Sequence, residues 1–253
     1  MEATARNKGR LRVAVAYPCS PDSLAAALAA HEDGMIDPLL VGPRQKIEAI
    51  AATLKISLDG LDFVETEDDP VAASRKAVAV ARAGDATALM KGSQHTDELM
   101  GAVVPREADM RTSKRMSHVF WFDLPAYHKP LMITDAVVNI TPVLKDKIAI
   151  VENAIDFAHA IKIAEPKIAM LSAVEFVNPA IASSVDAGEI AKLARAGQFK
   201  GALVDGPFGF DNAISKAAAA TKGVTSPVAG DPDILLVPNL DVGNILYKSF
   251  IYV

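Results

Sequence analysis

Short β-rich runs alternate with helical patterns along the chain, and this regularity constrains the fold more than any other feature of the sequence. The first β-rich run, 11–17, is followed by a helical pattern at 23–34, and the same order recurs at 37–55. Ser20 and Pro21 suit the N-cap and the first position of the first helix. Because such alternation produces parallel sheets that helices cover on both faces, the sequence predicts an α/β fold.

The alternation is interrupted after residue 117. Two β-rich runs, 117–125 and 130–140, are joined by a connection too short to hold a helix, which indicates an antiparallel pair of strands. We expect this pair to mark the crossing between two α/β/α lobes with mostly parallel sheets, the first at 1–140 and the second at 141–253.

The composition limits the class of protein. Of 253 residues, 51% are hydrophobic and 23% are charged, which excludes a disordered chain. The net charge of −5 argues against a bulk nucleic-acid binder, which needs a basic face, but it allows a small phosphorylated ligand. A single cysteine, Cys19, excludes an internal disulfide, and no apolar run matches a signal peptide or a membrane span. We therefore expect a soluble, cytoplasmic protein that binds neither nucleic acid nor membrane.

The run 240–253 is strongly apolar and ends without a capping glycine or a polar tail. One interpretation is a terminal helix docked on the core. The other is a chain that stops before its fold is complete, since an exposed apolar helix end usually continues into further structure.

The common catalytic motifs are absent from the sequence. There is no P-loop, no G-x-G-x-x-G turn, no H-E-x-x-H helix and no G-x-S-x-G elbow. The histidines show no metal-ligand spacing: His31, His95, His118, His128 and His159. The sequence therefore predicts no metal site.

Polar residues gather instead at the carboxyl ends of predicted strands, where doubly wound sheets bind ligands. Lys91 ends one such strand, and its ammonium and the amides that follow it suit a phosphate. Asp211 and Asn212 follow a later strand, and Asn239 and Asn244 follow another. Each junction also has an ordinary interpretation as a turn or a helix cap, but three of them in one chain favour a ligand site.

A basic stretch stands out in this acidic chain: Arg106, Arg111, Lys114 and Arg115. Because the planar guanidinium of arginine binds phosphate through two hydrogen bonds, this stretch could hold an acyl phosphate or a nucleotide phosphate. The alternative is a solvated loop whose charge is balanced by Glu107 and Asp109.

Several longer segments together resemble one protein family. They are MKGSQHTDELMGAVV, RTSKRMSHVF, PLMITDAVVNI, VENAIDFAHAIKIAEPKIAMLSAVEFVNP, DGPFGFDNAIS and SPVAGDPDILLVPNLDVGNILYK. From about Arg12 to Lys248, the chain is similar to the phosphate acetyl/butyryltransferase family. The resemblance implies two α/β/α lobes around a cleft, with an architecture like that of isocitrate and isopropylmalate dehydrogenases, assembled as a homodimer or a larger homo-oligomer.

The resemblance also implies an activity, the reversible transfer of an acyl group between coenzyme A (CoA) and inorganic phosphate. Phosphate acetyltransferase activity is expected first and phosphate butyryltransferase activity second, with the CoA thiolate attacking the acyl-phosphate carbonyl directly. CoA is a substrate here, and no metal or nicotinamide cofactor is implied. The residues expected to bind phosphate are Arg111, Arg115 and Lys91. Those expected to line the cleft and bind CoA are Asp211, Asn212, Asn239 and Asn244.

The chain departs from the family pattern in two places. The Ser-Arg pair and the aspartate after it, which are catalytic near the family's C-terminus, have no match here, so those roles go to no residue, Ser249 included. We therefore expect the first lobe to lack its usual C-terminal segment. Gly101 stands where acetyltransferases of the family often carry an arginine, which bears on acyl preference.

Two other interpretations stay open. An isocitrate-type decarboxylating dehydrogenase would need a cluster of metal-binding aspartates, which the segment DPDILLVPNLD does not convincingly supply. A truncated, non-catalytic family member would bind CoA, or a partner subunit, without forming a thioester.

Overall fold

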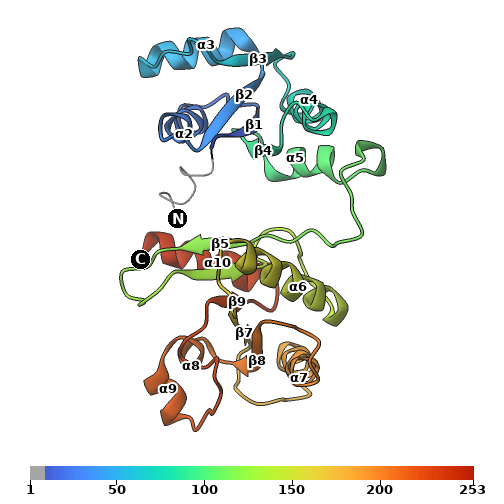
Figure 1. Ribbon diagram of the computed structural model, residues 1–253, viewed down its shortest axis with the longest axis vertical. Helices are drawn as coiled ribbons and strands as arrows, with labels where there is room; N and C mark the ends of the chain where they lie inside the picture. The colour runs from blue at the N-terminus through green and yellow to red at the C-terminus, as the bar shows by residue number, and fades with distance from the viewer. Residues whose placement is uncertain (1–8) are drawn as a thin grey trace. The chain divides into compact units, whose positions relative to one another are not determined.

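The computed structural model describes residues 9–253. The chain divides into two compact units, called here the N-terminal unit, Met1–Ser113, and the C-terminal unit, Lys114–Val253. Each unit has its own sheet and its own helices (Figure 1). The mixed α/β fold with largely parallel sheets is therefore confirmed.

Within the described residues, the N-terminal unit is built on a four-stranded sheet in the order β3-β2-β1-β4, and its strands pair in parallel. The strands are β1 (Leu11–Ala16), β2 (Ile36–Gly42), β3 (Asp62–Glu65) and β4 (Ala88–Lys91). The helices are α2 (Pro21–Glu32), α3 (Arg44–Leu54), α4 (Pro70–Ala83), α5 (Thr96–Val103) and the 3-10 helix η1 (Arg106–Ala108). Parallel pairing follows because a helix separates each strand from the next.

Helices cover both faces of this sheet. Val13 and Val15 of β1 pack against α2 and α3, whereas Ala14 and Ala16 of β1 pack on the opposite face, with α4. Ser20 caps α2 as the sequence predicts, because its hydroxyl accepts a hydrogen bond from the backbone N–H of Ser23. The buried residues of the unit thus alternate along each strand between two apolar layers.

The C-terminal unit is built on a five-stranded sheet in the order β5-β6-β9-β7-β8. The strands are β5 (Phe120–Phe122), β6 (Leu131–Thr134), β7 (Lys167–Leu171), β8 (Leu203–Phe208) and β9 (Ile234–Leu236). The helices are α6 (Leu144–Ala160), α7 (Ala182–Arg195), α8 (Phe210–Ile214), α9 (Lys216–Thr221) and α10 (Leu240–Tyr252). The β5–β6 pair is antiparallel, as predicted, and the other pairs are parallel.

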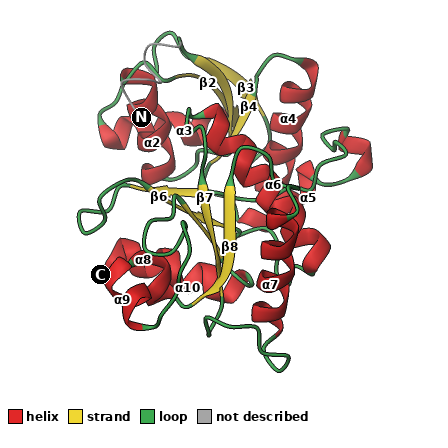
Figure 2. Ribbon diagram, turned by 60° about the horizontal axis from the view of Figure 1, so that its bottom comes forward, coloured by secondary structure: helices red, strands yellow, loops and turns green. Residues whose placement is uncertain are grey.

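The two faces of the second sheet carry different helices. Ile168 and Met170 of β7 pack against α6 and α7, whereas Ala169 and Leu171 of β7 pack against α8 and α10. In Figure 2, α7 lies along one side of the β7–β8 pair and α8 lies on the other. The arrangement brings the carboxyl ends of β7 and β9 to the same edge of the sheet.

The division between the units falls at 113/114, earlier than the predicted 140/141. The strand pair that was expected to cross between two lobes belongs entirely to the second sheet, because β6 pairs with β9 and β5 pairs with β6. Composition does not reveal this, since an antiparallel pair can sit between two sheets or at the edge of either.

The helical segment after β8 is divided in two. α8 and α9 are separated at Ser215. The Ser215 hydroxyl accepts a hydrogen bond from the backbone N–H of Ala218 and so starts α9. A serine that caps a new helix thus ends the previous one.

The apolar run at 240–253 forms α10, one face of which docks on the second core. Tyr247 packs against Phe120 with ring centroids 4.2 Å apart, and Phe250 packs against Phe122 at 5.4 Å. Another side of α10 carries exposed apolar residues, among them Ile245. None of the helices within residues 9–253 combines the length and the apolar character that crossing a bilayer requires.

Candidate functional site

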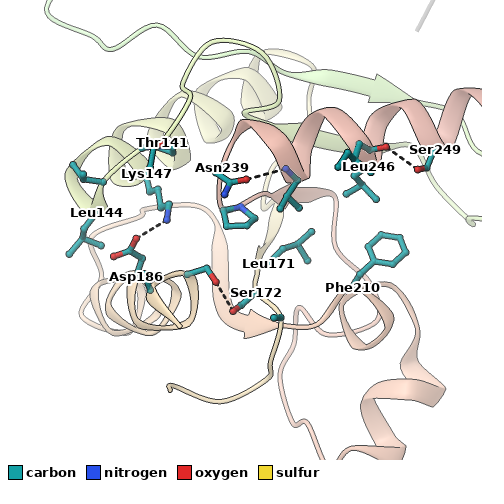
Figure 3. Close-up of a pocket in the computed structure, with 18 residues that line it drawn as sticks. Thr141, Leu144, Lys147, Leu171, Ser172, Asp186, Phe210, Asn239, Leu246 and Ser249 are labelled. Atoms are coloured by element: carbon teal, nitrogen blue, oxygen red, sulfur yellow. Dashed lines mark hydrogen bonds and ion pairs between the residues drawn. The ribbon is translucent and has the colours of Figure 1, made fainter. Parts of the chain in front are cut away.

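A cavity of about 800 Å³ opens at the carboxyl edge of the second sheet (Figure 3). Its floor includes Leu171 and Ser172, where β7 ends, and Pro238 and Asn239, which follow β9. The lining also includes residues at the N-terminal ends of α6, α7 and α8, the segment 141–143 before α6, and residues along α10 as far as Ser249. Because helix N-termini present unpaired N–H groups and a positive end of the helix dipole, the cavity favours an anionic ligand group.

The cavity also lies where the connections of the sheet reverse direction. From β7 the chain passes through α7 to β8 on one side, whereas from β9 it enters α10, which contacts β6 on the other side. In open α/β sheets, ligands bind in the crevice that such a reversal leaves at the carboxyl ends of the strands. The position therefore marks a ligand site independently of any motif.

Lys147 of α6 is the buried cation of this cavity, with 5% of its surface exposed. Its Nζ donates a hydrogen bond to Oδ2 of Asp186 at 2.7 Å, and it has no second partner among the described residues. An ammonium carries three N–H donors, so two are left for a ligand. Because burying unpaired donors costs free energy, a buried lysine with spare donors beside a cavity indicates a binding role.

Two hydroxyl groups lie in the same cavity. Ser172 Oγ, which follows β7, and Ser183 Oγ, in the first turn of α7, are 2.9 Å apart. Their mutual hydrogen bond uses one hydroxyl proton, so the other can be donated to a ligand. Lys147, Ser172 and Ser183 thus provide donors but present no free negative charge of their own.

The rest of the lining is mainly apolar. Figure 3 shows Lys147 and Asp186 at one end of the cavity, and Phe210 and Leu246 at the other, with Leu171 between them. The side chain of Leu171 is nearly buried, whereas Phe210 is 37% exposed. The cavity therefore offers a polar end and an apolar end to one ligand.

Of the residues predicted to line a CoA site, Asn239 lies at this cavity. It caps α10, because its Oδ1 accepts a hydrogen bond from the backbone N–H of Val242 at 3.0 Å. Asn244 lies further along the same helix and is not part of the lining. Its contact with CoA stays a prediction.

Asp211 and Asn212 follow β8 near the cavity but are not part of its lining. A hydrogen bond from Lys222 holds the pKa of Asp211 below its ordinary value. Asn212 is completely buried, and neither polar atom of its amide has a hydrogen-bond partner. A buried amide of this kind cannot reach a ligand as it stands, so its role in CoA binding stays a prediction.

The predicted phosphate ligands have different surroundings. Arg111 is exposed and pairs with no described residue, whereas Arg115 donates to Asn139 Oδ1 at 2.6 Å and pairs with Asp146 at 2.8 Å. Lys91 donates to the carbonyl oxygen of Gln94 at 2.6 Å. The amides that were expected to bind phosphate beside Lys91 are occupied, since those of Gly92 and Ser93 donate to the carbonyl oxygens of Ala16, the last residue of β1, and Tyr17.

Lys147, Asp186, Ser172 and Ser183 were missed by the sequence analysis. The signal for Lys147 lies in its register: it is on the same stripe of α6 as Val151, Ala154 and Ala158, which are buried. A lysine on a core-facing stripe is rarely buried without a partner or a function. Nothing in the sequence indicates that Asp186 or the two serines lie near Lys147, since they come from separate elements.

In the described part of the chain, no group of three or more histidine, cysteine, aspartate or glutamate side chains is placed to bind a metal ion.

Comparison with known proteins identifies the family. Residues 71–252 match the family described as Phosphate acetyl/butaryl transferase. The chain belongs to this family. It is 45% identical over 243 residues to the phosphate acetyltransferase of Rickettsia prowazekii, covering 96% of this chain and 69% of that relative. It is 41% identical over 241 residues to the phosphate butyryltransferase of Clostridium beijerinckii, covering 95% of this chain and 80% of the relative.

A solved structure from the family confirms the fold. A branched-chain phosphotransacylase from Enterococcus faecalis superposes with a TM-score of 0.80 at 33% identity, covering 95% of this chain and 84% of that one. The acetyl- and butyryltransferase relatives are nearly equal in identity to this chain. Family membership is therefore shown, whereas similarity alone does not separate the two acyl groups.

Proposed function

We propose that this protein catalyses the reversible transfer of an acyl group between CoA and inorganic phosphate. Its family membership supports a phosphate acyltransferase. One observation supports particular residues for this activity: Lys147 is a buried ammonium with two spare N–H donors, and it lines the same cavity as the Ser172–Ser183 hydroxyl pair. Donors held in a largely apolar cavity stabilise a developing negative charge far more than donors in water do.

The chemistry requires such donors. In the direction of thioester formation, the CoA thiol loses its proton to a base, and the sulfur bonds to the acyl carbon. The bond from that carbon to the phosphate oxygen then breaks, and phosphate leaves with the electron pair. Negative charge builds first on the carbonyl oxygen and then on the phosphate. Lys147 and the spare serine hydroxyl would stabilise this charge, and Asp186 would hold the lysine in position.

Further residues belong to the proposal as binding groups. Arg111 is favoured for phosphate because its guanidinium has no partner among the described residues, whereas Arg115 and Lys91 already donate to protein groups. Asn239 is favoured for the CoA side because it lies at the cavity. A cytoplasmic location and assembly into a homodimer or larger oligomer stay predictions.

The first experiment is thioester formation by the 253-residue chain from CoA and acetyl phosphate, with butyryl phosphate measured in parallel. Lys147→Met should lower kcat/KM at least a hundredfold, the usual effect of losing a donor to a developing oxyanion. Lys145→Met is the matched control, because Lys145 is an exposed lysine of the same helix with no partner among the described residues, and it should leave kcat/KM unchanged.

Circular dichroism of both variants would show that the fold is retained. No thioester from either acyl phosphate would contradict the proposed activity for this chain. Thioester formation that is equally fast in Lys147→Met would leave the activity standing and remove Lys147 from it.

A further inference from the structure

The apolar end of the cavity is larger than an acetyl group requires. A volume of about 800 Å³ is in the range of pockets that enclose drug-sized ligands, roughly 300–1,000 Å³. The methyl group of an acetyl phosphate held at Lys147 would leave most of the wall formed by Leu171, Phe210 and Leu246 without contact. An acyl chain with more carbon atoms would cover it.

The same wall includes apolar side chains that otherwise face water. Phe210 is 37% exposed and Ile245 is 67% exposed, although both line the cavity. Each methylene of a ligand that covers such surface gains free energy from leaving water. The apolar lining therefore binds a longer alkyl chain more tightly, and the polar end binds an anionic group.

The polar end limits what the occupant can be. Lys147 with Ser172 and Ser183 offers several donors at one end, and the first turns of α6 and α7 add positive potential there. A wholly apolar segment of another protein would leave those donors buried and unpaired. An acyl phosphate satisfies both ends at once, with its phosphate and carbonyl at Lys147 and its alkyl chain at Phe210.

We propose that the apolar end of this cavity holds the alkyl chain of the acyl substrate, and that it makes the enzyme prefer butyryl phosphate over acetyl phosphate. This inference rests on the proposed function, and it reverses the order of acyl groups expected from the sequence. Phe210 and Ile245 are the residues that set the preference, because they form exposed parts of the apolar wall.

The first test compares acyl phosphates with the full chain and CoA. Two methylenes separate butyryl from acetyl, and each gives about a fourfold gain when it leaves water. We therefore expect kcat/KM for butyryl phosphate to exceed that for acetyl phosphate about fifteenfold. An equal or higher value for acetyl phosphate would overturn the inference while leaving the proposed acyltransferase activity intact.

The second test removes the wall. Phe210→Ala and, separately, Ile245→Ala should each lower the butyryl-to-acetyl ratio of kcat/KM about fourfold or more, without a matching loss in acetyl use. Phe176→Ala is the matched control, since Phe176 is 58% exposed in the same unit but does not line the cavity, and it should leave the ratio unchanged. Ile245 is mostly exposed, so its variant keeps the test valid if Phe210→Ala fails to fold.

Calorimetric titration without CoA separates failure of this inference from failure of the proposed function. Butyryl phosphate that binds about fifteenfold more tightly than acetyl phosphate, with the difference reduced in Ile245→Ala, would support the cavity assignment even if no thioester forms. A change in the KM for CoA in Phe210→Ala or Ile245→Ala, with an unchanged acyl ratio, would assign the apolar wall to CoA and overturn the inference. Dissociation of a dimer in Ile245→Ala, again with an unchanged ratio, would assign the wall to a second copy of the chain and also overturn it.

Discussion

Arg111 and Arg115 belong to one basic stretch, yet their guanidinium groups have different surroundings. Arg115 is held by Asn139 and by Asp146, whose side chain is 13% exposed. These contacts fix the segment after Ser113 to the start of α6. Arg111 has no such contacts and stays exposed. At the scale of single residues, Arg111 is therefore the better candidate for an anion that arrives from solution.

Arg111→Ala should raise the KM for phosphate about tenfold or more in the direction from acyl-CoA to acyl phosphate, because a charge-assisted hydrogen bond is lost. The KM for acyl-CoA should stay the same. Initial rates at varied phosphate concentration measure the effect. Arg75→Ala, which removes another exposed arginine without a partner among the described residues, is the control. An unchanged phosphate KM in Arg111→Ala would remove this residue from the site.

Single residues also show where sequence analysis stops. The N-cap at Ser20 and the helix cap at Asn239 could be predicted, because capping depends on neighbouring backbone groups. The contact between Lys147 and Asp186 could not, because 39 positions separate them and only the packing of α6 beside α7 brings them together. Local interactions are visible in the sequence, whereas this site is made by tertiary contacts.

At the scale of elements, the alternation of strands and helices was predictable because each element buries its own periodic stripe. The strand order was not. β9 lies between β6 and β7 although it comes last in the chain, and that insertion creates the reversal at the cavity. Which strand fills the middle of a sheet depends on side-chain packing on both faces, and the hydrophobic pattern of one strand does not encode it.

An ionic cluster ties the amino ends of three neighbouring strands. Asp231, before β9, accepts hydrogen bonds from Lys167 at the start of β7 and from His128 before β6, and it pairs with Lys129. Burial alone would raise the pKa of Asp231, but the hydrogen bonds from Lys167, Lys129 and His128 outweigh it and hold the pKa well below its ordinary value. The carboxylate is 20% exposed, so solvent screens the cluster only in part.

Asp231→Asn should lower the free energy of unfolding by about 2 kcal/mol at pH 7, because, among the described residues, Lys167 loses its charged partner and Lys129 keeps only Asp233. The pKa of Asp231 is lower in the folded than in the unfolded chain, where it is about 3.9. Its contribution is therefore complete above that unfolded value and is lost as the pH falls through the folded one. Urea unfolding at pH 7 and at lower pH should show that the difference in free energy of unfolding between wild type and variant becomes smaller as the pH falls.

Asp123→Asn removes the same charge from an exposed aspartate that has no partner among the described residues, so its effect should be small at every pH. If the loss of unfolding free energy in Asp231→Asn stays constant as the pH falls, it comes from altered packing and not from loss of the ionised carboxylate.

At the scale of the whole molecule, each unit has its own sheet and its own apolar layers. The chain leaves the N-terminal unit after η1, and residues 109–119 form no helix or strand before β5 begins. A core that is complete on both faces of its sheet can stay folded when the connecting segment is cut.

Limited trypsin digestion of the native chain should therefore cut first after Arg111, which is exposed, lacks a partner among the described residues and lies in this segment. Lys114 and Arg115 are less open to the protease because they pair with Asp156 and Asp146 of α6. Mass spectrometry should find a C-terminal fragment that begins at Thr112, and Arg111→Gln should abolish it.

A first cut inside α7 or α4 would show that those helices open before the connecting segment does, and the two-unit description would then fail. If the fragment from Thr112 keeps its circular dichroism signal, the C-terminal unit, cavity included, holds its fold without the N-terminal sheet.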